Sequence, residues 1–224
     1  MIFFDLDDTL LDHRSAQDKA ALAWREDVDA RFVEQDATDF AEIWHSATLR
    51  NWKLFERGEI SFAEQRRRRI RDIVRDPHLS AQDADALFAR FVPFYEANWN
   101  LFPDVLPCLE LLKDHQLGVL TNGDPEQQVR KLERFGLTRR MEVVVILGEN
   151  GPRKPSPRAF ELAAERAKVQ AVECLYIGNQ IETDAVAARA AGWRGVWLDR
   201  SGIMVAPNGI ERITSLLDVP FLLK

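Results

Sequence analysis

Two aspartates follow the first apolar run of this chain at a spacing that can do chemistry. Residues 1–4 are apolar with no turn residue, and they lead directly into Asp5 and Asp7, which are two positions apart. We interpret the run as a short buried strand that presents both carboxylates at its C-terminal end, where open parallel sheets bind ligands. Because neighbouring carboxylates repel each other, the pair is typical of a site for a hard divalent cation. The structural alternative is a strand end followed by a helix N-cap.

Two further polar groups follow later in the chain. Thr121, Asn122 and Gly123 come directly after an apolar run at residues 117–120. A hydroxyl beside an exposed N–H can bind a phosphate oxygen, although an Asn–Gly pair is also a common turn. Lys154 stands between prolines, so its backbone is stiff and its ammonium can be aimed. The alternative for this lysine is a surface position before a helix-starting proline.

The last polar group follows the apolar run at residues 174–177. Gly178 lets the backbone come close to a ligand, and Asn179 and Asp184 offer oxygen atoms that could bind a cation. The alternative is a loop with Asp184 in the first turn of a helix, where acidic residues are favoured. All of these groups therefore follow apolar runs or stand near them, as ligand-binding residues do in parallel sheets.

The elements that must position these groups are of two kinds. Residues 13–95 form an almost entirely helical block, with segments at 18–30, 38–55, 61–74 and 80–97. After residue 104, strands at 117–120, 143–147, 174–177 and 195–198 alternate with helices at 104–115, 125–135, 156–167 and 184–191. This alternation predicts a parallel sheet with right-handed crossovers. We therefore expect an α/β fold, a doubly wound parallel sheet with a Rossmann-like core (residues 1–12 and 96–224) and an inserted all-helical domain (13–95).

Composition excludes several classes of protein. The 224 residues are 46% hydrophobic, and the net charge of -6 argues against a general nucleic-acid binder. No apolar run is long enough to span a bilayer, and residues 1–4 are too short for a signal peptide. Cys108 and Cys174 stand in apolar contexts and are expected to be buried free thiols of a cytoplasmic protein. Arginines 66–69 are interpreted as a solvated helix face, with contact between one arginine and an anionic ligand as the alternative. Oligomeric state is not readable from the sequence.

In this order, around one helical insertion, the polar groups resemble the four motifs of haloacid dehalogenase-like hydrolases. The resemblance is to the phosphatases that carry a helical cap after the first motif, and it extends over residues 2–198. It implies that Asp5 is the nucleophile, that Asp7 is the general acid/base, and that Thr121 and Lys154 hold the transferring phosphoryl group. The implied reaction hydrolyses a small phosphomonoester through an aspartyl-phosphate intermediate.

The resemblance also implies a magnesium site and a substrate site. The Mg²⁺ ligands would be Asp5, the backbone carbonyl of Asp7, Asn179 and Asp184, and the substrate-binding residues would be Asn122, Gly123 and His13. One departure from the family pattern is Asn179, which stands where an aspartate is usual. The substitution removes a negative charge near the metal, so we expect weaker Mg²⁺ binding.

The substrate is less sharply indicated. Residues 52–61, with 121–123 and 127–130, resemble a subgroup that contains nucleoside 5′-monophosphatases, and sugar-phosphate and phosphoglycolate phosphatases share this pattern. A phosphomutase, a 2-haloacid dehalogenase and a non-catalytic relative remain alternatives, although dehalogenases lack an acid at the position of Asp7. His13, Arg14, Trp52 and Phe55 are candidates to face the substrate. The alternative for His13 is an exposed position at a helix start, and the two aromatic residues have the helical spacing of a core.

Overall fold

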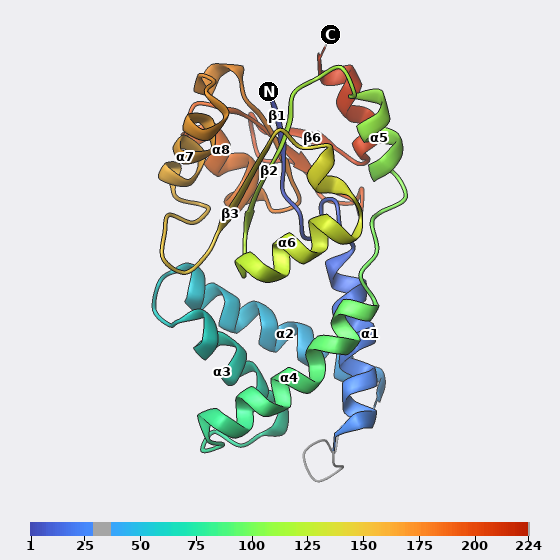
Figure 1. Cartoon of the computed structure of the whole chain (residues 1–224), viewed down its shortest axis with the longest axis vertical. Coiled ribbons are helices and arrows are strands. Elements are labelled where there is room, and N and C mark those ends of the chain that lie inside the picture. Colours follow the sequence, from blue (N-terminus) through green and yellow to red (C-terminus); the bar gives the residue numbers. More distant parts are fainter. Residues whose placement is uncertain (29–36, 224) are drawn as a thin grey trace. The chain divides into compact units, whose positions relative to one another are not determined.

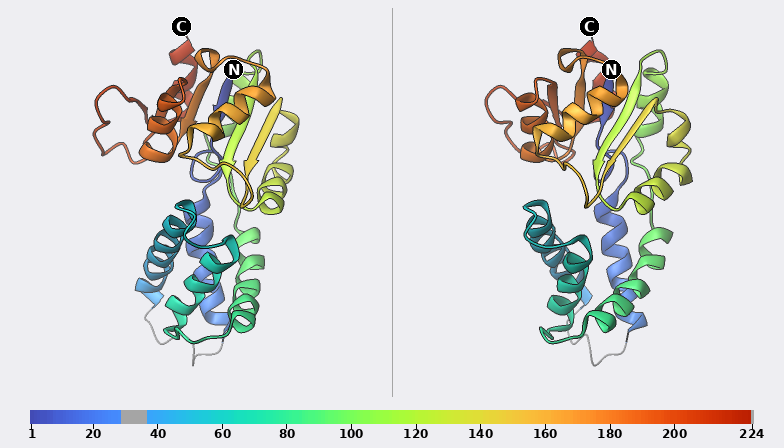
Figure 2. Two further views of the ribbon diagram at one scale, coloured as in Figure 1. Left: turned by 90° about the vertical axis from the view of Figure 1, so that its left-hand side faces the viewer. Right: turned by 60° about the vertical axis from the view of Figure 1, so that its left-hand side comes forward.

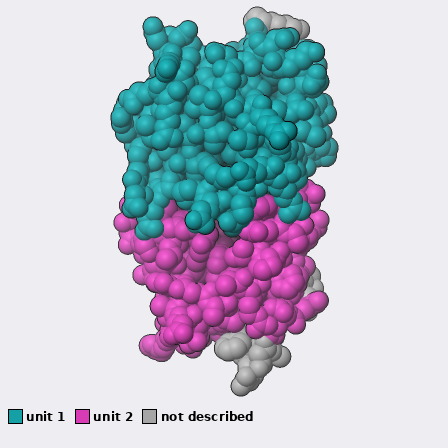
Figure 3. All heavy atoms as spheres, viewed as in Figure 1, with its two compact units in different colours: residues 1–11, 101–224 teal, residues 12–100 magenta. Residues whose placement is uncertain are grey.

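The chain forms two compact units, each built from its own elements. The structure, a computed structural model, describes residues 1–28 and 37–223. Unit 1 comprises Met1–Leu11 and Leu101–Lys224, and unit 2 comprises Asp12–Asn100 (Figure 3). Within unit 1, Leu11 and Leu101 pair in an isolated antiparallel bridge, so the two ends of the interruption lie side by side.

Unit 1 is built on a parallel sheet (Figure 1). The described residues contribute β1 (Ile2–Phe4), β2 (Leu117–Asn122), β3 (Val143–Leu147), β4 (Leu175–Gly178), β5 (Arg194–Leu198) and β6 (Glu211–Ile213). Their order in the sheet is β3-β2-β1-β4-β5-β6, and every neighbouring pair is parallel. The predicted α/β fold with a doubly wound parallel sheet is confirmed. Strand β6 was not predicted, because its three residues include Glu211 and Arg212 and so lack an apolar run.

Helices cover both sides of this sheet. They are α5 (Val105–Leu111), α6 (Pro125–Arg134), α7 (Pro157–Ala167) and α8 (Ala187–Ala190), with a π-helical turn η4 (Ile181–Val186) before α8. Figure 2 shows α7 on one side of the sheet and α5 and α6 on the other. Shorter 3₁₀ segments are η2 (Leu137–Arg139), η3 (Ala171–Glu173) and η5 (Leu216–Leu223). The core on the α7 side is aromatic, with Phe3, Phe160, Tyr176 and Trp193 packed together. Cys108 and Cys174 are buried free thiols, as predicted.

Unit 2 consists of four helices in its described part. They are α1 (His13–Asp27), α2 (Ala37–Glu56), α3 (Phe62–Val74) and α4 (Ala81–Ala97). The last two residues of the helix expected at 18–30 lie outside the described residues. The side chains of Ser61 and Ser80 accept hydrogen bonds from the backbone N–H three residues later and so cap α3 and α4. Among the helices that the structure describes, none has the length and apolar character that crossing a membrane requires.

Several residues of unit 2 that were candidates for other roles are buried in its core. Phe55 is fully buried and packs against Phe62 and the partly buried Trp52, which confirms the core interpretation for Phe55. The interpretation of arginines 66–69 as a solvated face is wrong for Arg69, which is 4% exposed. Its guanidinium donates to Gln65 and lies near the ring of Phe88, so one position of the run faces inward because the helix turns through 100° per residue.

Candidate active site

The first cluster of the site is centred on the ammonium of Lys154. Its Nζ donates to Asp5 Oδ1 at 2.9 Å, to Asp184 Oδ1 at 2.6 Å and to the hydroxyl of Tyr176 at 2.7 Å. Asp5 follows β1, Asp184 lies in η4 and Lys154 precedes α7, so three elements meet here. All four side chains are buried. The structure thus brings together Asp5, Lys154 and Asp184, which the sequence analysis singled out separately.

Burial and charge act against each other in this cluster. Burial raises the pKa of Asp5 to about 6, with the Lys154 charge opposing the shift and the charges of Asp184 and Asp7 adding to it. Burial alone would lower the pKa of Lys154, but the charges of Asp184 and Asp5 outweigh it and raise that pKa. Two carboxylates therefore share one ammonium in a region with little water. The excess of negative charge is suited to a further cation.

Tyr176 is a member of this cluster that the sequence analysis missed. Its hydroxyl accepts from Lys154 and donates to the carbonyl of Leu120 at 2.7 Å. Burial, together with the charges of Asp184 and Asp5, raises the tyrosine pKa well above its usual value, so the group stays neutral. In the sequence this tyrosine lies in a run that is expected to form a buried strand. Because a buried Tyr hydroxyl needs a hydrogen-bond partner, its presence there was the available sign of a polar contact.

The second cluster surrounds Asp7. Lys131 Nζ donates to Asp7 Oδ1 at 2.7 Å and to Oδ2 at 2.9 Å, and Gln128 Nε2 donates to Oδ2 at 3.0 Å. Both donors come from α6 and are buried, whereas the Asp7 side chain is 25% exposed. Lys131 was not among the residues predicted for the site. The available signal was its position on one helix face with Gln128 and the apolar Leu132.

The C-terminal end of β2, with Gly123 after it, connects the two clusters. Gln128 Nε2 also lies 3.1 Å from the hydroxyl of Thr121, so one amide contacts both Asp7 and Thr121. The side chain of Asn122 exchanges two hydrogen bonds with the backbone of Lys154, at 2.9 and 3.0 Å. Gly123 has φ +149°, and a Cβ there would lie 3.0 Å from the Gln128 side chain. Asn122 and Gly123 therefore shape the positions of Lys154 and Gln128.

The residues at and after the end of β4 are closely packed but offer few negative charges to a metal. Asp184 packs so closely on Gly178 that a Cβ at that glycine would lie 2.3 Å from the carboxylate. The Asn179 amide oxygen accepts from the Thr9 hydroxyl at 3.5 Å, and its backbone carbonyl accepts from Trp197. Within residues 1–28 and 37–223, no three His, Cys, Asp or Glu side chains gather as a metal site. The oxygen donors of Asp5, the Asp7 carbonyl and Asn179 are nevertheless of the kind that a hard cation takes.

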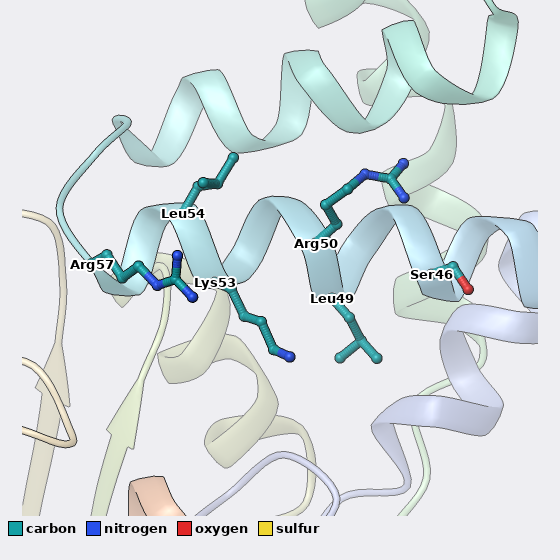
Figure 4. A pocket seen from close by; sticks show the side chains of 6 residues that line it. All are labelled: Ser46, Leu49, Arg50, Lys53, Leu54 and Arg57. Atoms are coloured by element: carbon teal, nitrogen blue, oxygen red, sulfur yellow. The ribbon is translucent and has the colours of Figure 1, made fainter.

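His13 lies in unit 2, where it contacts other residues of that unit. Its ring nitrogens hydrogen-bond to the Tyr95 hydroxyl and, at 2.9 Å, to the amide of Gln17. A hollow of about 440 Å³ also lies on unit 2 (Figure 4), lined by Ser46, Leu49, Arg50, Lys53, Leu54 and Arg57 of α2. Two of its cationic side chains have acidic neighbours, Arg50 with Asp72 and Arg57 with Glu59. The hollow holds none of the predicted site residues.

Comparison with known proteins identifies the family. The haloacid dehalogenase-like hydrolase family model matches residues 1–192. The chain belongs to this family. It is 33% identical to N-acylneuraminate-9-phosphatase of Homo sapiens over 130 residues, which cover 56% of the chain and about half of that enzyme, 52%. It is 29% identical over 214 residues to 5-amino-6-(5-phospho-D-ribitylamino)uracil phosphatase of Escherichia coli, covering 87% and 81% of the two chains.

A solved structure resembles the whole chain. It is that of a haloacid dehalogenase-like hydrolase of Bacillus subtilis bound to magnesium, with a TM-score of 0.82 and 22% identity. The alignment covers 100% of this chain and 97% of the other. At this level of identity the likeness establishes a shared fold.

Proposed function

We propose that this haloacid dehalogenase-like hydrolase is a Mg²⁺-dependent phosphatase that hydrolyses a small phosphomonoester through an aspartyl-phosphate. The observation that carries the proposal is the separation of two carboxylates by environment. Asp5 is buried against Lys154, whereas Asp7 is held by Lys131 and remains partly exposed. Two carboxylates in contrasting environments are typical of sites where they take different roles, and the family resemblance gives the role of nucleophile to Asp5, which has the Lys154 ammonium as its counter-charge.

In the first step a carboxylate oxygen of Asp5 attacks phosphorus. The new P–O bond forms as the bond to the leaving alcohol breaks, and Asp7 in its acid form gives a proton to the departing oxygen. In the second step water attacks the aspartyl-phosphate and Asp7 takes a proton from it. The bond between phosphorus and Asp5 breaks, inorganic phosphate leaves, and Asp7 is again protonated for the next cycle.

The remaining residues stabilise charge on the phosphoryl oxygens. Thr121 offers its hydroxyl and Lys154 its ammonium, and Asn122 holds the Lys154 backbone in place. Asp5, the Asp7 carbonyl and Asn179 would hold Mg²⁺, with Asp184 beside them. When bound, Mg²⁺ would supply positive charge to the phosphoryl group and balance the carboxylates.

The curated relatives favour a small phosphorylated metabolite as substrate. The names of the two relatives above specify a phosphorylated acidic sugar and a phosphorylated ribityl compound. A nucleoside 5′-monophosphate is the class that residues 52–61 suggested. We therefore expect the substrate to be a sugar phosphate, a sugar-acid phosphate or a nucleoside 5′-monophosphate.

The test is hydrolysis of p-nitrophenyl phosphate with and without Mg²⁺, followed by a panel of these phosphates. Wild-type protein should release phosphate only with the metal, and Asp5→Asn should release none. Halide release from a 2-haloacid without phosphatase activity would replace the proposal with a dehalogenase. Absence of both activities across the panel would favour a non-catalytic relative.

A further inference from the structure

Helix α6 turns two polar side chains toward the interior of unit 1. Gln128 and Lys131 are both 1% exposed, and they share the buried face of the helix with Leu132. They are three residues apart, so they lie one above the other on the same face. A helix that only supported the sheet would carry apolar residues at such positions.

The charge of Lys131 is costly to bury and is placed against one acidic partner. Its ammonium reaches both oxygens of Asp7, at 2.7 and 2.9 Å. Replacing a buried ion pair by apolar residues is often neutral or stabilising. The pair is therefore poorly explained by stability, whereas its geometry fixes the plane of the Asp7 carboxylate.

Gln128 adds a second restraint that links Asp7 to the phosphate-binding strand end. Its Nε2 lies 3.0 Å from Asp7 Oδ2, 3.1 Å from the Thr121 hydroxyl and 3.2 Å from the Asn122 carbonyl. Gly123 makes room for this amide, since a Cβ at Gly123 would crowd it at 3.0 Å. One buried side chain thus contacts both Asp7 and Thr121.

We infer that Lys131 and Gln128 form a clamp that positions Asp7 against the phosphoryl group, holding the ionised carboxylate by both oxygens as the base of the second step and the protonated carboxyl by one oxygen as the acid of the first. The inference rests on the proposed function. The clamp holds Asp7 from the buried side and leaves a quarter of the side chain open toward solvent. The leaving oxygen of the first step and the attacking water of the second would both reach Asp7 from this open side. Lys131 and Gln128 act through Asp7, so they are positioning residues.

Leaving-group chemistry separates this role from a merely structural one. An alkyl phosphate needs a proton on its departing oxygen, whereas 2,4-dinitrophenyl phosphate releases a stable phenolate without one. Hydrolysis of the intermediate needs Asp7 as base for both substrates. Loss of the clamp should therefore slow both steps with the alkyl phosphate but only the second with the dinitrophenyl ester.

The experiment compares wild type with Lys131→Met at saturating Mg²⁺. With an alkyl phosphate, kcat should fall by about a hundredfold, the lower range of general acid–base catalysis, with KM little changed. With 2,4-dinitrophenyl phosphate, stopped-flow should record a first-turnover burst at the wild-type rate, followed by slow turnover. Gln128→Glu places a second carboxylate beside Asp7. It should likewise leave the burst with 2,4-dinitrophenyl phosphate at the wild-type rate while slowing the turnover of both substrates. Lys113→Met is the matched control, because Lys113 is 64% exposed, and it should behave as wild type.

The double variant Asp7→Asn, Lys131→Met completes the design. If Lys131 acts through Asp7, adding Lys131→Met should lower kcat only slightly further once Asp7 has been replaced by Asn. Additive losses, an equal fall of burst and steady rates, or an unchanged kcat in both Lys131→Met and Gln128→Glu would overturn the inference. Failure of the proposed function is a different result, because wild type itself would then hydrolyse neither phosphate.

Discussion

The Lys154 ammonium lies 2.6 Å from Asp184 Oδ1, and both side chains are almost completely buried. The same ammonium contacts Asp5 at 2.9 Å, so it is the direct counter-charge of the nucleophile that we propose. Removing one partner from a buried ion pair leaves an uncompensated charge, which is far more destabilising than losing a surface pair. The cluster therefore couples activity to stability.

Lys154→Met should abolish turnover and lower the free energy of unfolding by about 3–5 kcal/mol near neutral pH. Without the ammonium, Asp5 and Asp184 repel each other, and protonation of either relieves the repulsion. The loss should consequently shrink as the pH falls. Urea unfolding at pH 5 and pH 8, with Lys113→Met as control, measures it. A loss that stays constant between the two pH values would contradict the shared-ammonium arrangement.

Asp5→Asn should abolish turnover and yet stabilise the metal-free protein above about pH 6. The pKa of Asp5 is raised to about 6, mainly by burial, so folding favours its protonated form. That contribution to stability is present below the unfolded-state pKa and is lost as the pH rises through about 6. An amide resembles the protonated carboxyl and keeps the contribution. Thermal melts in EDTA across pH 4–8 test this, and a melting temperature below wild type at pH 8 would count against it.

The pH dependence of kcat/KM should have an acid limb that depends on Mg²⁺. Asp5 must be ionised to attack, so activity should fall as the pH drops through about 6 at the lowest Mg²⁺ that supports turnover. A bound cation favours the ionised carboxylate, and the limb should move to lower pH as Mg²⁺ increases. Rate profiles at several Mg²⁺ concentrations measure it. An acid limb that lies at the same pH at every Mg²⁺ concentration would show that Asp5 does not bind the metal.

Asn179→Asp should tighten Mg²⁺ and lower the concentration that gives half-maximal activity. The amide oxygen of Asn179 already accepts from Thr9, and a carboxylate could keep that bond while adding charge. Isothermal titration with Mg²⁺ in the absence of substrate gives a readout independent of turnover. Asn208→Asp makes the same change in an exposed loop and serves as control. Equal effects of the two substitutions would place Asn179 away from the metal.

The sequence predicted the architecture well because its signals are local. Apolar runs marked the strands β1 to β5, and parallel topology then required their carboxyl ends to lie at one edge of the sheet. That reasoning brings Asp5 and Asp184 to one edge of the sheet, whereas Lys154, which lies beyond β3 in a proline-rich segment, was indicated through the family resemblance. The helix expected at 184–191 instead begins as a π-helical turn at Ile181, where the Asp184 carboxylate accepts from the Gln180 N–H.

The clamp could not be predicted in the same way. Lys131 and Gln128 belong to a helix rich in charged residues, and although they share a face with Leu132, no local signal shows that this face meets Asp7. Their role depends on how α6 is rotated against the sheet, which is a tertiary property. Tyr176 was not predicted for a different reason: an aromatic residue in an apolar strand is normally interpreted as part of the hydrophobic core. Arg69 shows that a run of like residues on a helix cannot share one environment.

The central place of β1 has a consequence for the order in which the protein can assemble during synthesis. Ile2 pairs with Leu117 on one side and with Leu175 on the other. The ribosome therefore produces the middle strand first and its neighbours only after the whole of residues 12–100. Until then Phe3 and Phe4 have no sheet to enter, and these apolar side chains stay exposed on the nascent chain, where chaperones bind such segments.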